Sequence, residues 1–324
     1  MSQRPDDTDL AEIEAHAVRA ARGAGAILAG HFGSRLQVEY KDEHKSDPVT
    51  VADKDAQKYL VDAISDRFPD HGILAEEDPD DDAIAHDLTW VLDPLDGTRN
   101  FMSGLPVYAC SVGVLYKGAP VAGALFLPWP NADSGIVLHA RKDGGAFKDG
   151  EPITLEQDAE AGRSAIAGLP ASFGASYRFK KAAWDKVGEP RVTGSIAYEL
   201  GMVALGVLQY SVLTAPKLWD VAGGGALIAE SGGLVMRGQK SRGMSGLLGR
   251  AQWKPVEALV TSWESGATTH RKLRRWSVPL VLGSPGAVRR VTENLRRRTS
   301  VKRSVQSAVR RTVCGGQRYF GRGS

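Results

Sequence analysis

Residues 90–101, WVLDPLDGTRNF, place a short apolar run directly before two aspartates three residues apart. The run predicts the end of a buried strand. Pro94 bends the chain between the aspartates, so that Asp93, Asp96 and the Leu95 carbonyl can face one point. Carboxylate and carbonyl oxygens of this kind are what a hard divalent cation requires. A solvated loop or a helix cap is the alternative for such a turn taken alone.

Gly97 and Thr98 follow the two aspartates and open a turn or a helix. Free backbone N–H groups at such a position can contact a phosphate oxygen. The Thr98 hydroxyl can in addition position a water molecule. The stretch therefore combines oxygen ligands for a cation with donors for an anion.

Three further carboxylate positions favour a site over a plain turn. HGILAEE, residues 71–77, predicts a short buried strand that ends at Glu76 and Glu77, one of which can join the same cation. Asp53 lies in the first turn of a predicted helix, where it can be a cap residue or a general base. Asp220 begins another helix, ahead of three glycines that allow unusually close backbone packing. Each carboxylate alone can be structural, but together they form a coherent set.

The first half of the chain predicts helices packed on a largely antiparallel sheet. A helix should start with a capping box of Asp9 and Glu12, and a second should run from about Thr50 to before Pro69. Strands follow at residues 71–77 and 89–98, then a hairpin with KGAP at its turn, then a strand and a glycine-rich turn at 134–147.

A second unit should start after about residue 153. It contains predicted strands near 164–167, 191–193, 210–215 and 278–283, with helices over 195–209, 219–231 and 287–295. Residues 237–272 fit no clean period and are expected to be a loop insertion. The predicted division is an α+β unit with the metal site at 1–153, an α/β unit at 154–285, and a basic tail at 286–324.

The tail differs in charge from the rest of the chain. Residues 286–324 hold 11 Lys+Arg and one acidic residue, which leaves 30 Lys+Arg and 37 Asp+Glu in residues 1–285. Such a tail can contact nucleic acid or an anionic membrane, or it can be a solvated, partly disordered extension. A nucleic-acid-binding or regulatory protein that acts through this tail is therefore the alternative to an enzyme.

The remaining composition indicates the compartment. The N-terminal residues carry no apolar segment typical of a secretory signal, and no apolar run approaches the roughly 20 residues of a membrane span. Two cysteines are too few for a disulfide framework. A cytoplasmic location is expected.

Two long motifs give the chain a family resemblance. WVLDPLDGTRNF and WDVAGGGALIAESGG resemble the two signatures of the inositol monophosphatase superfamily of magnesium-dependent, lithium-sensitive phosphatases. VTVADKDAQ, ILAEED and ARKDGGAFKDGEPI occur in that family's order. The resemblance covers roughly residues 10–236 and 278–295. It implies a layered α/β/α/β/α fold of two units with the site between them, a small phosphorylated metabolite as substrate, and commonly a homodimer.

The resemblance also implies the metal ligands, as two or three Mg²⁺ ions. Glu76, Asp93 and the Leu95 carbonyl would hold the first ion. Asp93, Asp96 and Asp220 would hold the second, and a weaker third ion would lie near Glu76.

The resemblance assigns the remaining roles to residues around the metals. Asp53 and Thr98 would orient and deprotonate the attacking water, and Gly97 with Thr98 would contact the phosphate. Lys45 occupies the place of a family lysine near the active-site loop.

The family resemblance does not decide which phosphate ester is the substrate. Gly194 and Ser195 occupy the place that lines the family's substrate pocket. Leu213 stands where inositol-specific relatives have a glutamate that contacts sugar hydroxyls. Inositol monophosphate is therefore one candidate beside fructose 1,6-bisphosphate, 3′-phosphoadenosine 5′-phosphate and histidinol phosphate.

Overall fold

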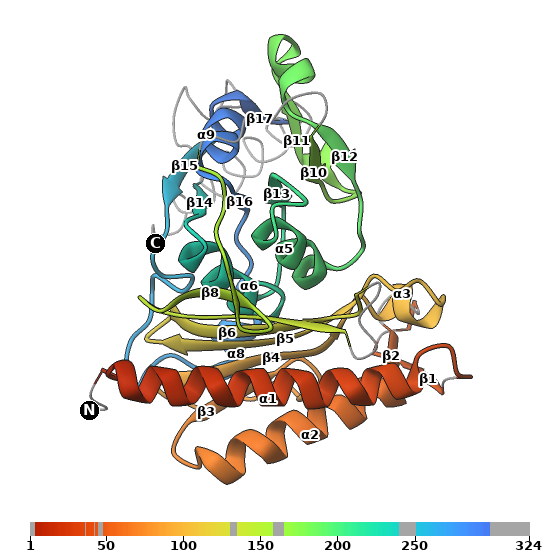
Figure 1. The fold of residues 1–324 in the computed structure, drawn as a ribbon, viewed down its shortest axis with the longest axis vertical. Coiled ribbons are helices and arrows are strands. Elements are labelled where there is room, and N and C mark those ends of the chain that lie inside the picture. The colour runs from red at the N-terminus through yellow and green to blue at the C-terminus, as the bar shows by residue number, and fades with distance from the viewer. Residues whose placement is uncertain are drawn as a thin grey trace, which may run out of the picture.

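The computed structural model describes residues 4–35, 37–41, 43–44, 48–129, 135–157, 165–239 and 251–298. These residues form five layers: a pair of helices, a seven-stranded sheet, a second pair of helices, a six-stranded sheet and a last helix (Figure 1). The α/β/α/β/α arrangement expected from the resemblance is therefore confirmed. Within the described residues no helix is both long enough and apolar enough to cross a membrane.

The outer helices α1 (Asp7–His31) and α2 (Val51–Arg67) pack against one face of the first sheet. Thr50 caps α2 and the helix ends at Arg67, as predicted. The predicted start of α1 is wrong, because Asp6 is its N-cap and forms the capping box with Asp9. Either pair of acidic residues satisfies the free N–H groups of a first turn, so the sequence pattern alone allows both registers.

The first sheet has the order β3-β4-β5-β6-β7-β8-β9. Only β3 and β4 are parallel, and the other pairs are antiparallel, as predicted. The hairpin turn after β5 lies at Lys117 and Gly118, within the predicted KGAP. The strands are β3 (Gly72–Ala75), β4 (Leu88–Asp96), β5 (Ala109–Tyr116), β6 (Ala119–Leu127), β7 (Ile136–Arg141), β8 (Gly145–Lys148) and β9 (Glu151–Ile153).

The inner helices α5 (Ile196–Ala204) and α6 (Leu218–Glu230) lie between the two sheets (Figure 1). Helix α6 packs unusually close to β5 and β6, as its glycines predicted. A Cβ atom at Gly113 of β5 would lie 2.4 Å from the Cβ atom of Ala222, and one at Gly123 of β6 would lie 2.5 Å from the Gly223 carbonyl oxygen. The predicted helix over 195–209 is shorter, since it ends at Ala204.

The second sheet has the order β12-β10-β13-β16-β14-β15, and α9 (Pro285–Asn294) packs on its outer side (Figure 1). Its strands are β10 (Ile166–Gly168), β12 (Glu189–Arg191), β13 (Tyr210–Leu213), β14 (Leu234–Gln239), β15 (Gln252–Pro255) and β16 (Leu280–Gly283). Smaller elements are β1 (Val38–Tyr40), β2 (Pro48–Thr50), α3 (Thr98–Met102), α4 (Phe173–Ser176), β11 (Tyr177–Phe179), the 3₁₀ helix Lys181–Lys186, α8 (His270–Arg274) and β17 (Leu295–Arg297).

The loop insertion predicted over residues 237–272 is wrong in part. Strand β15 pairs antiparallel with β14 at the edge of the second sheet, and α8 begins at His270. An edge strand that is largely exposed carries no apolar alternation, so residues 252–255 show no strand period. Residues 240–250 lie outside the described residues.

The basic tail overlaps the fold at its start. The expected boundary at residue 286 falls inside α9, whose side chains Ala287, Val288 and Val291 are buried together with Leu295 of β17. Residues 299–324, which hold the rest of the predicted tail, lie outside the described residues.

Candidate active site

Asp93 and Asp96 lie at the end of β4, where the register of its ladder with β5 shifts between them. Asp93 is buried, and its Oδ1 accepts a hydrogen bond from the Leu95 N–H at 3.1 Å. The Oδ2 of Asp96 accepts from the Ser195 hydroxyl at 3.0 Å and from the Ala197 N–H. The start of α5 therefore fixes Asp96 on the inner face of the first sheet.

Asp220 lies in the first turn of α6, across from Asp93 and Asp96. Its Oδ2 accepts a hydrogen bond from the Lys217 N–H at 2.7 Å, which closes the first turn of the helix. The Ser111 hydroxyl of β5 donates to the Trp219 carbonyl at 3.1 Å. This bond ties the start of α6 to the strand next to Asp93.

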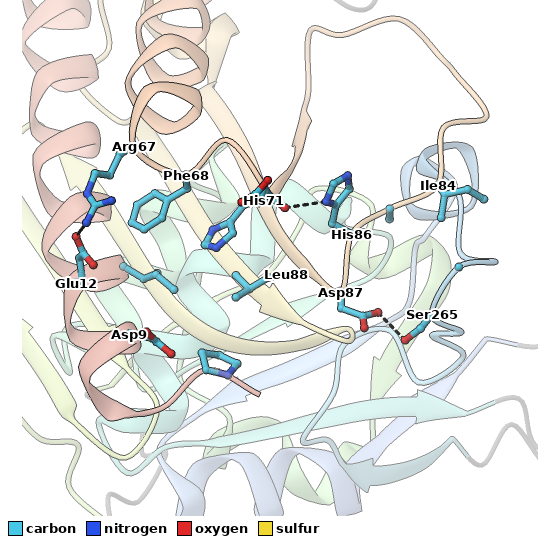
Figure 2. A pocket seen from close by; sticks show the side chains of 15 residues that line it. Asp9, Glu12, Arg67, Phe68, His71, Ile84, His86, Asp87, Leu88 and Ser265 are labelled. Atoms are coloured by element: carbon cyan, nitrogen blue, oxygen red, sulfur yellow. Dashed lines mark hydrogen bonds and ion pairs between the residues drawn. The ribbon is translucent and has the colours of Figure 1, made fainter. Parts of the chain in front are cut away.

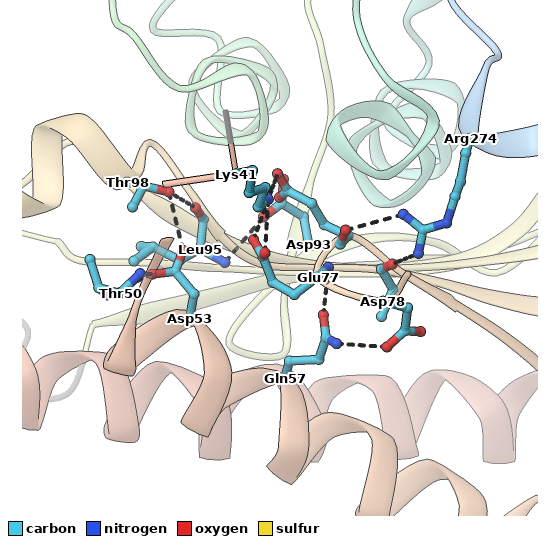
Figure 3. Close-up of polar contacts among 12 residues, drawn as sticks. Lys41, Thr50, Asp53, Gln57, Glu77, Asp78, Asp93, Leu95, Thr98 and Arg274 are labelled. Atoms are coloured by element: carbon cyan, nitrogen blue, oxygen red, sulfur yellow. Dashed lines mark hydrogen bonds and ion pairs between the residues drawn. The ribbon is translucent and has the colours of Figure 1, made fainter. Parts of the chain in front are cut away.

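Glu76 and Glu77 follow β3 directly and share one lysine partner. The Nζ of Lys41 lies 3.2 Å from Glu76 Oε1 and 2.8 Å from the Glu77 carboxylate. The Glu77 N–H donates to Gln57 Oε1 of α2 at 2.9 Å (Figure 3). Helix α2 and Lys41 thus hold this acidic turn against the end of the sheet.

Asp53 and Thr98 meet beside the carboxylates, although 45 residues separate them in sequence (Figure 3). The Oδ2 of Asp53 accepts from the Thr50 N–H at 2.7 Å and from the Thr50 hydroxyl at 2.6 Å. Its Oδ1 lies 3.2 Å from the Thr98 Oγ1, which is also 3.1 Å from the Leu95 carbonyl oxygen. Asp53 is therefore a helix cap residue and a partner of Thr98 at once.

Gly97 places Thr98 at this point by its backbone conformation. Its φ of 97° lies in the left-handed region, which a residue with a side chain rarely adopts. A Cβ atom at Gly97 would also lie 3.0 Å from both the Ser195 Cβ and the Val107 carbonyl oxygen. The turn therefore requires glycine for its conformation and for its close contact with α5.

Burial and mutual repulsion raise the pKa of these carboxyl groups. Burial first, then the charges of Glu76, Asp96 and Asp220, raises the pKa of Asp93 well above its ordinary value. Burial and then the Asp96 charge do the same to the pKa of Asp220, and burial raises the pKa of Asp96 to about 7. The pKa of Glu77 is raised to about 7 by burial and then by Glu76.

The chemistry of this donor set fits a hard divalent cation. All its ligand atoms are oxygens, and a group of mutually repelling carboxylates, with Asp93 buried and Asp96 and Asp220 half-buried, is stabilised when a cation binds among them. In the part of the chain that the structure describes, however, no three His, Cys, Asp or Glu side chains are gathered closely enough to hold a metal ion as they stand. The structure therefore shows the donors in one region, each oriented by protein hydrogen bonds, rather than a closed ligand shell.

A largely apolar cavity of about 360 Å³ adjoins Asp96 through Ser195. Gly194, Ser195 and Leu213, three of the six residues predicted for the substrate site, all line it. Its polar side chains bond mainly to one another: the hydroxyls of Ser172 and Thr214 are 3.2 Å apart, and the Thr193 hydroxyl lies 2.9 Å from the buried Glu199 carboxylate. The cavity thus offers few unpaired polar groups to a ligand. The remaining lining residues include Leu169, Pro170, Ala171, Val192, Ile196, Ala215 and Pro216.

A second cavity, of about 770 Å³, lies elsewhere, between the start of α1, the end of α2 and the segment before β4 (Figure 2). It contains His71 stacked on Phe68 and a hydrogen bond from His86 Nδ1 to the Asp70 carbonyl oxygen. None of the residues predicted from the sequence for the site lines it. The carboxylate region is therefore the candidate active site.

Most of the predicted site residues thus lie in one region of the structure, and one of them falls outside the described residues. Lys45 lies outside the described residues, so its assignment stays a prediction. Lys41 and Arg274 contact the acidic turn and were not predicted. Lys41 stands four residues before Lys45, and spacing alone does not choose between two lysines. Arg274 follows the predicted loop insertion, and no motif marks it.

The fold and this carboxylate region define a layered α/β/α/β/α protein with an acidic site at the end of β4. The model of the inositol monophosphatase family matches residues 9–275. The chain therefore belongs to the inositol monophosphatase family.

Individual relatives agree with this assignment. The chain is 32% identical to the Nus factor SuhB of Haemophilus influenzae over 224 residues, which cover 68% of this chain and 82% of the relative. It is 31% identical to a fructose-1,6-bisphosphatase/inositol-1-monophosphatase of Thermotoga maritima over 218 residues, 67% of this chain and 82% of the relative.

Solved structures show the same fold. An IMPase from Thermotoga maritima matches with a TM-score of 0.64 and 25% identity, covering 87% of this chain and 97% of that one. SuhB from Bartonella henselae matches with a TM-score of 0.64 and 21% identity over the same shares. The second likeness concerns the fold alone.

Proposed function

We propose that this protein hydrolyses a small-molecule phosphate monoester by direct attack of water. The observation that carries the proposal is that the charges of Glu76, Asp96 and Asp220 act on the buried Asp93, with the Asp53–Thr98 pair beside them. The first four side chains supply the oxygen ligands that a phosphatase of this family needs for cations. The pair supplies a route for the proton of the attacking water.

The cations implied by the family are Mg²⁺ ions, two or three in number. Glu76, Asp93 and the Leu95 carbonyl would hold one, and Asp93, Asp96 and Asp220 another. Bound Mg²⁺ would neutralise the phosphate, activate water and stabilise the leaving oxygen.

Asp53 and Thr98 are proposed to handle the proton. When the Thr98 hydroxyl donates to Asp53 Oδ1, its oxygen is free to accept a hydrogen bond from water. Burial raises the pKa of Asp53, although hydrogen bonds from Thr50 and Thr98 oppose that rise. A raised pKa makes the carboxylate a stronger base, so Asp53 can take up the proton that passes through Thr98.

The apolar cavity beside Ser195 is proposed to receive the alcohol part of the substrate. Leu213 is buried in its wall, and the nearby Glu199 is already bonded to Thr193 and Ser211. A polyol placed there would lose water without gaining hydrogen bonds, at a cost of about 1–3 kcal/mol for each unpaired group. Because the cavity walls are largely apolar and their hydroxyls are already partly paired, we expect inositol monophosphate to form few hydrogen bonds there and to be a poorer substrate than an ester whose alcohol has an apolar or aromatic part.

Phosphate release from four monoesters tests the function. The wild type is incubated with inositol monophosphate, fructose 1,6-bisphosphate, 3′-phosphoadenosine 5′-phosphate and histidinol phosphate, each with magnesium and with a chelator. Release from at least one ester that stops with the chelator supports the proposal. No release from any ester would refute it for these substrate classes.

A second candidate function is nucleic-acid binding through the basic tail, alone or beside catalysis. The observation in its favour is that residues 286–324 extend beyond the family match and carry 11 Lys+Arg against one acidic residue. The test is a truncation after Arg298, because a cut at residue 286 would also remove the buried side chains of α9. Binding that weakens with salt and is lost on truncation would support the tail; equal binding by both chains would exclude it.

A further inference from the structure

Arg274, the last residue of α8, carries a buried guanidinium that the proposed chemistry does not use. Its side chain is 9% exposed. Its Nη1 donates to the Glu76 carbonyl oxygen at 3.1 Å, and its Nη2 donates to the Ala75 carbonyl oxygen (Figure 3). Ala75 ends β3 and Glu76 is a predicted metal ligand. One guanidinium therefore donates hydrogen bonds to two consecutive backbone carbonyls of the segment that carries Glu76.

The same guanidinium also contacts the segment that carries Asp220. Its Cζ lies 5.6 Å from the centroid of the Trp219 ring, within the range of a cation–π contact. Trp219 directly precedes Asp220, and its carbonyl accepts from Ser111 of β5. Arg274 thus connects the end of β3 with the start of α6, the two segments on either side of Asp93.

Helix α8 is itself fastened to the acidic loop that follows Glu77. The Ala85 N–H donates to the Thr268 carbonyl at 2.8 Å, and the Arg271 N–H donates to the Asp81 carbonyl at 3.1 Å. Arg271 also pairs with Asp82 at 2.9 Å. The two backbone hydrogen bonds, together with the buried Leu273, fix the position from which Arg274 reaches the site, whereas the Arg271–Asp82 ion pair joins two exposed side chains.

We propose that Arg274 is a positioning residue that sets where Glu76 and Asp220 lie around the metal centre. The inference rests on the proposed function. A guanidinium is a rigid fork that can bond two carbonyls and stack on an aromatic ring at once, whereas the single ammonium of lysine cannot. Without the guanidinium, the Glu76 carbonyl loses a hydrogen-bond donor and the Trp219 ring beside Asp220 loses its cation–π contact. Partners that orient metal ligands in this way typically contribute roughly 10–100-fold to metal affinity.

Charge alone predicts the opposite result, which makes the proposal testable. A buried positive charge repels an incoming cation, so its removal by Arg274→Met would tighten metal binding if charge were the dominant effect. Arg274→Lys keeps the charge and loses the fork. Positioning predicts that both variants bind the metal more weakly. Arg271→Met is the matched control, because it removes a neighbouring arginine whose partner, Asp82, is exposed.

The experiment is calorimetric titration of Mn²⁺ and of Mg²⁺ into the full chain, as wild type and as each of the three variants. We expect Arg274→Met and Arg274→Lys to weaken binding by roughly tenfold or more and Arg271→Met to stay within about twofold of the wild type, the change expected for an exposed pair. Thermal unfolding with a chelator present checks that each variant folds. In phosphate release, excess magnesium should restore the rate of the Arg274 variants without a large change in KM.

Metal affinity in both Arg274 variants equal to or tighter than in the wild type would overturn the proposal. If Arg274→Met does not fold, Arg274→Lys alone decides in the same way. A wild type that binds metal but releases no phosphate would refute the proposed function, while the ratio of affinities still decides the role of Arg274. A wild type that binds neither metal would overturn both.

Discussion

The Thr98 hydroxyl lies 3.2 Å from the Asp53 carboxylate, and the other oxygen of that carboxylate caps α2 through Thr50. One side chain therefore joins the start of a helix to the turn after β4. Because hydrogen bonds fix both carboxylate oxygens of Asp53, the side chain does not have to reorient when substrate binds. Such preorganisation is what a proton-accepting group requires.

Removal of either member of this pair should lower kcat with little change in KM. We expect Asp53→Asn and Thr98→Ala each to reduce kcat by about 10²–10⁴-fold, the usual contribution of a positioned acid–base group. Asp55→Asn, on the same helix with an exposed ion pair to His31, should leave kcat within about twofold, because exposed ion pairs contribute little. Steady-state kinetics at saturating magnesium checks this. A normal kcat in Asp53→Asn would exclude Asp53 as the base.

Leu213 should control which alcohol is accepted. Leu213→Gln places a hydrogen-bonding group in the apolar wall of the cavity, and one added bond is worth about 0.5–1.5 kcal/mol. We therefore expect kcat/KM for inositol monophosphate to rise by up to about tenfold relative to the other esters. Leu213→Met, which keeps the wall apolar, should leave the ratio unchanged. If both variants change the ratio equally, the wall does not set specificity through hydrogen bonding.

The close approach of α6 to β5 should make two glycines respond in opposite ways to alanine. Gly113→Ala brings its Cβ within 2.4 Å of the Ala222 Cβ and should lower the free energy of unfolding by about 1–3 kcal/mol or more. Gly225→Ala, whose Cβ would lie 3.9 Å from the Leu259 side chain, should raise it by up to about 1 kcal/mol through helix propensity. Urea unfolding with a chelator present measures both. A loss of equal size in the two variants would contradict the close packing.

Glu199 should make stability fall as pH rises. Burial raises its pKa above the ordinary value of 4.5, although Ser211 and Thr193 donate hydrogen bonds that oppose the rise. Below pH 4.5 the carboxyl is protonated in both states. As pH rises from there to the folded pKa, only the unfolded chain loses the proton, so stability falls by about 1.4 kcal/mol for each unit of pKa shift and then levels off.

Glu199→Gln removes this dependence. The stability of the variant relative to the wild type should therefore increase between pH 4 and pH 8, as measured by urea unfolding across that range. A difference that does not vary with pH would show that burial does not raise the pKa of Glu199 in the folded state.

Local sequence predicted which carboxylates lie near one another at the end of β4 better than it predicted the bounds of the surrounding elements. Asp93, Leu95 and Asp96 follow one strand within four residues, so local sequence brings them together without any knowledge of the fold. Asp53 and Asp220 are marked in the sequence by their helix starts, but only the family resemblance implies their roles at the metal centre. Their nearness to β4 depends on how α2 and α6 pack on the first sheet, which residue spacing does not specify.

The unpredicted parts have physical reasons of their own. Arg274 acts through its side chain on backbone carbonyls 198 and 199 residues away, and a carbonyl leaves no sequence signal. Strand β15 is an exposed edge strand whose residues do not alternate between apolar and polar. Its pairing with β14 therefore leaves no recognisable pattern in its own sequence. The start of α1 was misplaced because two acidic capping pairs overlap in its first turn.

The most direct test of the account is phosphate release with magnesium by the wild type and by Asp96→Asn, measured side by side on the best of the four esters. Asp96 is held in place by Ser195 and Ala197, and asparagine keeps its shape while removing the charge that a cation requires. The account predicts magnesium-dependent release by the wild type and a loss of at least about 10²-fold in the variant, as for the removal of a metal ligand's charge. Equal rates in the two proteins would contradict the metal-assisted mechanism at this site.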